Sequence, residues 1–217
     1  MKKFVVVLLA IGALYHFKPG LFHFGNKGAF DSKGNAQALL FTQDGCGIHC
    51  DMAVKELTER GVAFQEVKLN SDDNIHRFQN LGSTGAIPFL AVGSQVVQGY
   101  DKGEFASVLS QNFGDGALTR AELLFYKRHF NAEGKPLVYM YGATWCGYCK
   151  ELRAQMQSRK IEFVEVDVDM DPDKALINDA MDLSVYPITY VGYKRIVGAS
   201  KTDQVLEALK TAGKHKA

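Results

Sequence analysis

Short apolar runs and longer amphipathic segments alternate along most of the chain. In the C-terminal half, residues 137–141 form an apolar run, residues 161–168 alternate with period two, and residues 188–191 and 195–197 flank a turn at Gly192. These patterns predict strands, because a half-buried strand places successive side chains on opposite faces. Helices are predicted from the cysteines to about Arg159, from Asp171–Pro172, and over residues 202–211. The expected order is strand, helix, strand, helix, strand, strand, helix.

The same pattern occurs twice. The distance from Cys50 to Pro88 equals the distance from Cys149 to Pro187, and an offset of 99 residues aligns about fifty positions without a gap. Upstream the offset becomes 100, because the first copy has one inserted residue between its two cysteines. The chain is therefore an internal repeat of one small unit.

Each copy predicts an α/β fold. A strand–helix–strand unit gives two parallel strands, and the following hairpin adds an antiparallel edge. The expected product is a four-stranded mixed sheet flanked by helices, with one domain over residues 36–113 and a second over residues 135–213. Residues 114–134 form a linker, in which Thr119 and Glu122 have capping-box spacing and predict an accessory helix, packed on the second copy, to about Phe130. A helix that binds a partner is the alternative.

The first 19 residues begin with Met1, Lys2 and Lys3, followed by twelve uncharged residues, Phe4–Tyr15. A basic stretch before a short apolar stretch is typical of a secretory signal, whereas a membrane span usually needs about 20 apolar residues. We therefore expect a signal peptide, or an N-terminal membrane anchor where the segment stays uncleaved; a buried first strand is the alternative. Residues 20–35 are rich in glycine and turn formers and predict a tether.

Composition and charge narrow the classes of function. With 47% hydrophobic and 23% charged residues, the chain is not a disordered one. The 25 lysines and arginines against 24 aspartates and glutamates leave a net charge of +1, which provides no basic footprint for nucleic acid. Four cysteines are too few for a disulfide-rich scaffold, but they form two pairs, one in each copy.

The pair in the second copy, Cys146 and Cys149, follows a predicted strand and opens a predicted helix. The free N–H groups and the dipole at a helix N-terminus stabilise a thiolate, which lowers the pKa of the first thiol and makes it nucleophilic at neutral pH. The second cysteine can close a disulfide and expel what the first has captured. Pro187, just before a strand, fits a cis-proline that offers a backbone edge to a substrate chain. A zinc half-site or an inert disulfide is the alternative, although the second copy contains no histidine as a further ligand.

The strand, the Trp-Cys-x-x-Cys-Lys motif, the helix and the later Pro187 resemble the thioredoxin superfamily, and the short copy length resembles the glutaredoxins. The pair Gly147–Tyr148 resembles that of periplasmic disulfide isomerases. The resemblance implies that Cys146 is the attacking thiol, Cys149 the resolving thiol and Pro187 the substrate-facing proline. It gives supporting roles to the neighbouring residues Trp145, Tyr148, Lys150 and Tyr186.

Two features of the family patterns differ in this chain. Thioredoxins bury an aspartate six residues before the first cysteine, where this chain has Met140 and, in the first copy, Leu40. Glutaredoxins carry Thr-Val before the proline, in contact with glutathione, whereas Val185–Tyr186 precede Pro187 here. The expected chemistry requires no cofactor, and the use of glutathione stays open.

The pair in the first copy, Cys46 and Cys50, has three intervening residues. On a helix, positions i and i+4 share a face with Cα atoms about 6 Å apart, inside the disulfide range, so a second redox pair with Pro88 is feasible. The alternative is a metal site. A Cys-x-x-x-Cys pair on this fold resembles the Sco-type copper chaperones, thiolates favour Cu(I), and His49 or His76 would be the added ligand. A purely structural disulfide is the third interpretation.

The sequence therefore predicts a thiol–disulfide oxidoreductase that exchanges disulfides with protein substrates through Cys146 and Cys149 and is served by a redox partner. The alternative is a copper-binding chaperone that uses Cys46 and Cys50. The N-terminal segment predicts export, which in a bacterium means the periplasm, with the inner membrane as the place of anchoring.

Overall fold

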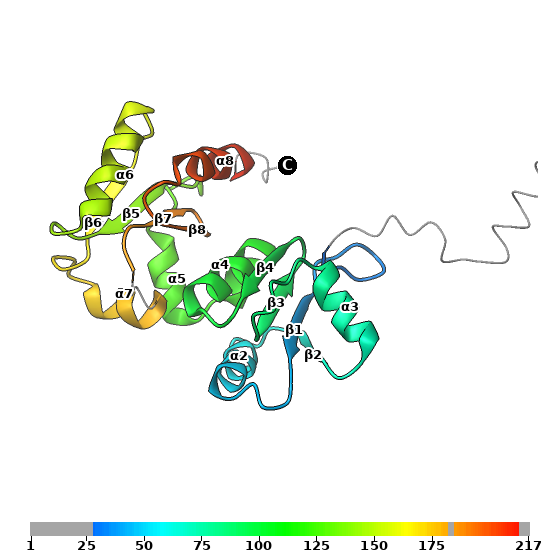
Figure 1. The fold of residues 1–217 in the computed structure, drawn as a ribbon. Helices are drawn as coiled ribbons and strands as arrows, with labels where there is room; N and C mark the ends of the chain where they lie inside the picture. Colours follow the sequence, from blue (N-terminus) through cyan, green and yellow to red (C-terminus); the bar gives the residue numbers. More distant parts are fainter. Residues whose placement is uncertain (1–27, 182–184, 213–217) are drawn as a thin grey trace, which may run out of the picture.

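The computed structural model describes residues 28–181 and 185–212. Residues 28–113 form what we call the first module (Figure 1). Its elements are β1 (Ala38–Thr42), α2 (Ile48–Glu59), β2 (Phe64–Lys68), α3 (Asp72–Asn80), β3 (Phe89–Val92), β4 (Gln95–Gln98) and α4 (Lys102–Phe113).

Residues 128–212 form the second module and repeat the series. Its elements are β5 (Val138–Gly142), α6 (Gly147–Ser158), β6 (Val164–Asp167), α7 (Lys174–Met181), β7 (Ile188–Val191), β8 (Lys194–Val197) and α8 (Thr202–Ala212). A short 3-10 helix, Gly114–Ala117, and α5 (Arg120–Lys127) connect the modules. Helix α7 begins three residues later than predicted, because the side chain of Asp171 accepts a hydrogen bond from the N–H of Asp173 and closes a turn there.

Each module contains a four-stranded mixed sheet, in the orders β2-β1-β3-β4 and β6-β5-β7-β8. In both sheets the first two strands are parallel and the other neighbours are antiparallel. The central strands also share their register, since Phe41 pairs with Phe89 and Tyr141 pairs with Ile188. This topology confirms the predicted α/β fold of two tandem thioredoxin-like domains.

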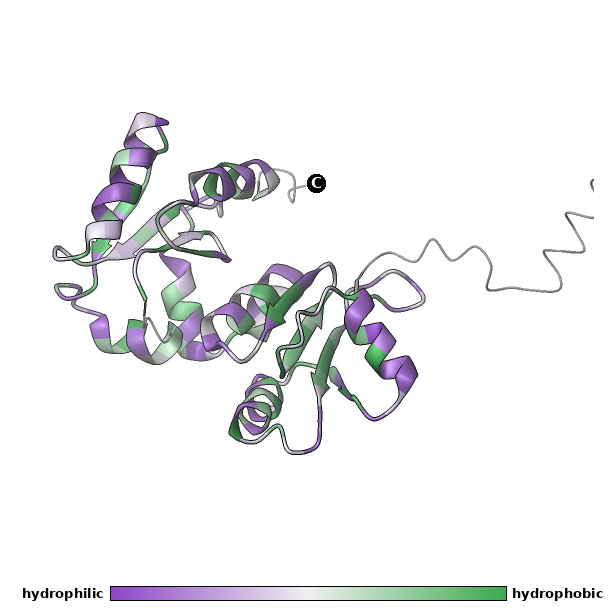
Figure 2. Ribbon diagram, in the orientation of Figure 1, coloured by the Kyte–Doolittle hydropathy of each residue, from purple (hydrophilic) through white to green (hydrophobic). Residues whose placement is uncertain are grey.

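The central strands are buried on both faces, and alternate side chains pack into different clusters. In β5, Met140 packs with Leu152 and Met156 of α6, whereas Tyr141 packs on the other face with Phe125 and residues of α7. This is the alternation that a strand between two helical layers must show. The hydropathy colouring shows hydrophobic central strands in the first module and helices that alternate between hydrophilic and hydrophobic residues (Figure 2).

Both modules begin upstream of the predicted boundaries. In each, a phenylalanine forms a β-bridge just before the first strand; the pairs are Phe30–Ala36 and Phe130–Pro136. Between the bridged residues, the side chain of Asp31 or Asn131 accepts two backbone hydrogen bonds and closes a turn. Ala29 is fully buried, and its N–H donates to the carbonyl of Gly93 at 2.7 Å. The prediction of a tether is therefore wrong from residue 28 onward, because these residues pack on the first sheet.

Helix α4 joins the two modules, since it completes the core of the first and lies against β8 and α7 of the second (Figure 1). The hydroxyl of Ser107 donates to the carbonyl of Tyr193 at 2.8 Å and accepts from the N–H of Arg195 at 3.1 Å. It thereby satisfies backbone groups at the start of the edge strand β8. The buried Arg195 also binds Glu104, with Nη1 and Oε1 2.9 Å apart. A Cβ at Gly103 would lie 2.9 Å from Arg195 Nε, so the close approach requires glycine.

Helix α5 begins with the predicted capping box, in which Thr119 and Glu122 exchange side-chain and backbone hydrogen bonds. Glu122 also binds Arg60 at the end of α2, and both side chains are fully buried. Phe125 and Tyr126 pack into the core of the second module, as predicted for an accessory helix.

Within the two described ranges, none of the helices combines the length and the apolar character needed to cross a bilayer. The predicted signal peptide or anchor, residues 1–19, lies outside the described residues, as does the first part of the predicted tether.

Candidate active site

The two cysteines of the second module lie at the N-terminus of α6. Cys146 is the N-cap residue, Cys149 lies in the first turn, and the two form a disulfide with Cα atoms 5.3 Å apart. The N–H of Cys149 donates to Cys146 Sγ at 3.1 Å. A backbone donor and the positive end of the helix dipole therefore act on this sulfur, the arrangement that stabilises a thiolate once the disulfide is reduced.

The end of strand β5 approaches the pair closely. A Cβ at Gly142, the last residue of β5, would lie 2.7 Å from Cys149 Sγ and 3.2 Å from its Cβ, closer than packed atoms tolerate. Glycine therefore lets the sulfur of Cys149 lie directly against the strand. Met140, two residues earlier, is fully buried, so an apolar side chain occupies the place where thioredoxins bury a carboxylate.

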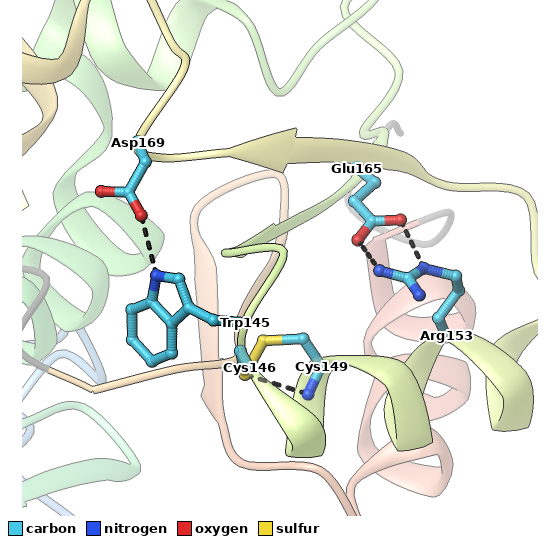
Figure 3. The surroundings of a disulfide bond; sticks show 6 residues. All are labelled: Trp145, Cys146, Cys149, Arg153, Glu165 and Asp169. Carbon is cyan, nitrogen blue, oxygen red and sulfur yellow. Dashed lines mark hydrogen bonds and ion pairs between the residues drawn. A yellow bond between two sulfur atoms is a disulfide. The ribbon is translucent and has the colours of Figure 1, made fainter.

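Hydrogen bonds between polar side chains hold Trp145 and helix α6 in place beside the disulfide. The indole Nε1 of Trp145 donates to Asp169 at 2.9 Å (Figure 3). Lys174 Nζ donates to the other oxygen of the same carboxylate at 3.0 Å. These two hydrogen bonds, that of Lys174 first, hold the pKa of Asp169 below its usual value. Arg153 forms two hydrogen bonds with Glu165 and ties α6 to β6 (Figure 3).

Asp169 is not among the site residues predicted from the sequence. The predicted topology could have identified Asp169, because β5 and β6 are parallel and the loops that follow parallel strands meet at the same edge of a sheet. Trp145 follows β5 and Asp169 follows β6, so the topology alone brings them together.

The loop before β7 lies beside this group. The peptide bond between Tyr186 and Pro187 is cis, as expected. The ring of Tyr186 lies 6.1 Å from that of Trp145 and packs against the core cluster that contains Cys146. Burial raises the pKa of the Tyr186 phenol. The remaining predicted supporting residues are exposed on the first turn of α6: Tyr148 and Lys150.

The first module also contains a disulfide, Cys46–Cys50, with Cα atoms 5.8 Å apart. The prediction that both cysteines lie on a helix is wrong, because α2 begins at Ile48 and Cys46 lies in the preceding loop. Gly45 and Gly47 adopt φ angles of 78° and 73°, a region that favours glycine, and the loop absorbs the inserted residue. The N-cap residue of α2 is Gly47, so neither cysteine of the first module occupies the N-cap position that Cys146 occupies in the second.

The copper alternative gains no support. Among the described residues, no three histidine, cysteine or acidic side chains come together in a group that could hold a metal ion. His49 and His76 are exposed. Pro88, at the position equivalent to Pro187, also follows a cis peptide bond.

A histidine, His129, packs among the aromatic residues of the core cluster that contains Cys146 and Cys149. His129 Nε2 is hydrogen-bonded to the hydroxyl of Tyr141 at 2.8 Å, and its ring stacks on Tyr190 with centroids 4.8 Å apart. Burial, and then the charge of Arg128, lowers the pKa of His129 to about 3, so the ring is neutral at physiological pH. His129 is not among the residues predicted from the sequence, because it falls in the predicted linker.

The fold and the site together define a protein of two tandem thioredoxin-like modules, the second of which carries a Cys-x-x-Cys pair at a helix N-terminus. Residues 137–194, which lie within the second module, match the family model described as Glutaredoxin. A domain of this family with a cysteine pair at disulfide distance is typical of thiol–disulfide oxidoreductases.

Among curated proteins, the chain is similar to the mitochondrial thioredoxin O of Oryza sativa subsp. japonica, with 35% identity over 89 residues that cover 36% of this chain and 51% of that protein. The chain thus matches about half the length of this curated relative.

Similar solved structures include a glutaredoxin from Archaeoglobus fulgidus, with 20% identity, a TM-score of 0.30 and coverage of 40% of this chain and 94% of that one. Glutaredoxin C1 from Populus tremula x tremuloides has 22% identity, a TM-score of 0.33 and coverage of 42% and 98%. Mitochondrial thioredoxin 3 from Saccharomyces cerevisiae has 30% identity, a TM-score of 0.27 and coverage of 35% and 76%.

Proposed function

We propose that the protein is a thiol–disulfide oxidoreductase that acts on protein substrates through Cys146 and Cys149. The observation that carries the proposal is the position of Cys146 at the N-cap of α6, where the N–H of Cys149 donates to its sulfur. A helix N-terminus favours the thiolate, which is the nucleophilic form. The glutaredoxin-family match over residues 137–194 supports the same chemistry.

In the reducing direction, the Cys146 thiolate attacks one sulfur of a substrate disulfide. A mixed disulfide forms, and the second substrate sulfur leaves as a thiolate that takes up a proton from water. Cys149, deprotonated, then attacks Cys146 Sγ, so that the Cys146–Cys149 disulfide forms and the first substrate sulfur leaves. Two electrons pass from the protein to the substrate, and a partner dithiol returns them. The oxidising direction is the reverse of these steps, and neither requires a bound cofactor.

The experiment that tests this function is trapping of the mixed disulfide. In Cys149→Ala the second step is blocked, so a reduced variant mixed with a disulfide-bonded substrate protein should accumulate an adduct at Cys146, detectable by non-reducing electrophoresis and peptide mass spectrometry. The matched control is Cys50→Ala, which makes the same change in the first module. An adduct at Cys46 in the control, with none at Cys146 in Cys149→Ala, would contradict the assigned roles.

We also propose that the protein is exported and held at a membrane by its first 19 residues, which supports a role in compartments where protein disulfides form. Fusion of residues 1–35 to a reporter enzyme that is active only outside the cytoplasm tests this. Activity of the fusion is the expected result, and activity that also depends on Lys2 and Lys3 supports a signal or anchor.

A further inference from the structure

A crevice of about 320 Å³ lies between the two modules. Its walls come from β4 and the start of α4 in the first module, and from β8 and the loop before β7 in the second. Val96 of β4 and Val185 of that loop both line it, and they are 38% and 48% exposed. The crevice therefore has an apolar residue from each module on its surface.

Exposed apolar residues connect this crevice to the proposed active site. Trp145, directly before Cys146, is 69% exposed and its ring contacts Tyr186. Val185 directly precedes Tyr186 and shares the crevice with Val96. We call Trp145, Tyr186, Val185 and Val96 the apolar strip. Exposed apolar residues that gather beside polar ones are typical of a site that binds another protein chain.

The charged residues that line the crevice give it a net negative charge. Three of its lining residues are charged, namely Asp101, Glu104 and Arg195. The side chain of Arg195 is only 3% exposed, because α4 covers it, whereas the side chains of Asp101 and Glu104 are 45% and 32% exposed. Arg195 Nη1 pairs with both carboxylates, at 3.3 Å to Asp101 and 2.9 Å to Glu104, so the three groups carry a net charge of −1 and the exposed part of the group is carboxylate, which complements a lysine or arginine.

Resting on the proposed function, we propose that a substrate protein binds along the apolar strip as an extended segment, with its cysteine at Cys146 and a basic residue in the crevice. The first module then supplies the specificity surface for the cysteines of the second. The hydrogen bonds of Ser107 to β8 and of Glu104 to Arg195 hold the two walls of the crevice together, so the surface is present before the substrate arrives.

The test measures binding without chemistry. A set of fluorescent peptides with serine in place of cysteine moves one lysine along an apolar segment, and fluorescence anisotropy reports the Kd of each for the full chain. Val96→Ser should raise the Kd of the best peptide about fivefold, because it removes one apolar contact. Val185→Ser, on the other wall, should do the same.

The matched control is Val164→Ser. Val164 is 43% exposed on β6, at the opposite edge of the second sheet from β8, and its replacement should leave the Kd unchanged. A second arm tests the charge: Glu104→Gln should reduce the preference for a lysine peptide over its glutamine counterpart about threefold.

Three results would overturn the proposal: no peptide of the set binds the wild type, Val164→Ser weakens binding as much as Val96→Ser, or the chain forms a dimer that Val96→Ser dissociates. The last result assigns the strip to a second copy. Because the peptides contain no cysteine, these outcomes are independent of the trapping experiment, so failure of the proposed function and failure of the docking surface are distinguishable.

Discussion

The two modules share their topology and register, yet their cysteines meet the following helix differently. In the second module Cys146 is the N-cap of α6, and its sulfur accepts the N–H of Cys149. In the first, Cys46 lies in the loop before α2, and the N-cap is Gly47. Because a helix terminus stabilises a thiolate where its N–H groups meet the sulfur, this difference predicts a more nucleophilic thiol at Cys146 than at Cys46.

The strand beneath each pair differs as well. Gly142 and Thr42 are the last residues of β5 and β1, at equivalent positions. Gly142 leaves room for Cys149 Sγ, whereas Thr42 is buried and its hydroxyl donates to Glu66 at 2.6 Å. The cysteine pair with two intervening residues thus belongs to the module whose strand ends in glycine. The pair with three intervening residues belongs to the module whose strand ends in a β-branched residue. The contact of Gly142 with Cys149 Sγ predicts that the strand residue and the cysteine spacing depend on each other in the second module.

The largest difference between the modules should be in reactivity. We expect Cys146→Ser to lower the rate of disulfide exchange with a protein substrate at least about a thousandfold, because a serine hydroxyl cannot form the mixed disulfide. Cys46→Ser should retain most of the wild-type rate. Stopped-flow measurement of substrate reduction checks both variants. Equal losses would show that the pairs act in series and that the first is as necessary as the second.

The arginines that end α2 and α6 give the next comparison. Arg60 and Glu122 form an ion pair whose side chains are fully buried, whereas Arg159, at the equivalent position, pairs with Asp203 on the surface. Arg60→Ala leaves a carboxylate buried without its partner and should lower the free energy of unfolding by about 3 to 5 kcal/mol. Arg159→Ala should cost about 1 kcal/mol or less.

Urea denaturation followed by far-UV circular dichroism measures both free energies. The m-value is proportional to the surface exposed on unfolding. A lower m-value in Arg60→Ala would therefore indicate that α5 has already detached from the first module in the folded state. Similar small losses in the two variants would mean that the buried pair contributes no more than the exposed one.

These differences explain what the sequence predicted and what it did not. Apolar periodicity and the repeat identified all four strands of each sheet, because both record which face of an element is buried. The boundaries failed at residues 28–36, where the packing depends on a polar turn at Asp31 and a buried Ala29 rather than on an apolar run. Cys146 and Cys149 were found because their chemistry depends on local spacing.

Contacts between elements that are distant in the sequence cannot be recognised from periodicity or local spacing. Ser107 binds the edge of β8, and Gly103 lets Arg195 approach α4, but neither residue departs from an ordinary helix sequence. The position of the inserted residue was visible, yet its effect was not. Periodicity alone cannot show that the loop at Gly45 and Gly47, rather than the helix, accommodates it.

The stability of the two modules should depend differently on pH because of His129. The equivalent residue of the first module is Ala29, and both residues are fully buried. The folded-state pKa of His129 is about 3, below its ordinary value of 6.5, so the unfolded chain binds the proton more tightly. The stability that this difference contributes is complete above pH 6.5 and is lost as the pH falls towards 3. The limiting slope is about 1.4 kcal/mol per pH unit.

Hydrogen exchange, corrected for intrinsic rates, should therefore show that amides of β5 and β7 lose protection between pH 6.5 and 4 faster than amides of β1 and β3. His129→Phe is the control, because it keeps an aromatic ring in the cluster and removes the titrating group. The two modules should then lose protection alike. A steep loss in β5 that persists in His129→Phe would assign the effect to carboxylates instead.

The smallest effect concerns the strand residue. Gly142→Ala places a methyl group 2.7 Å from Cys149 Sγ, so the sulfur must move. A free thiol can rotate away, whereas the sulfur of a disulfide is fixed by its partner, so the oxidised state is destabilised more than the reduced one. Overpacking of this kind costs about 1 to 3 kcal/mol, and 1.4 kcal/mol corresponds to about 30 mV for a two-electron couple.

We therefore expect the reduction potential of the Cys146–Cys149 pair to become less negative by about 20 to 60 mV in Gly142→Ala, measured by equilibration with glutathione in a chain whose first pair is replaced by serines. Lengthening the loop of that variant to the Cys-Gly-Ile-His-Cys sequence of the first module should relieve the contact and return part of the shift. Thr42→Ala, made in a chain that retains only the first pair, is the matched control, because it removes a hydroxyl without adding atoms near Cys50. If Gly142→Ala leaves the potential unchanged, the spacing of the cysteines is set by the loop alone and the strand residue has no part in it.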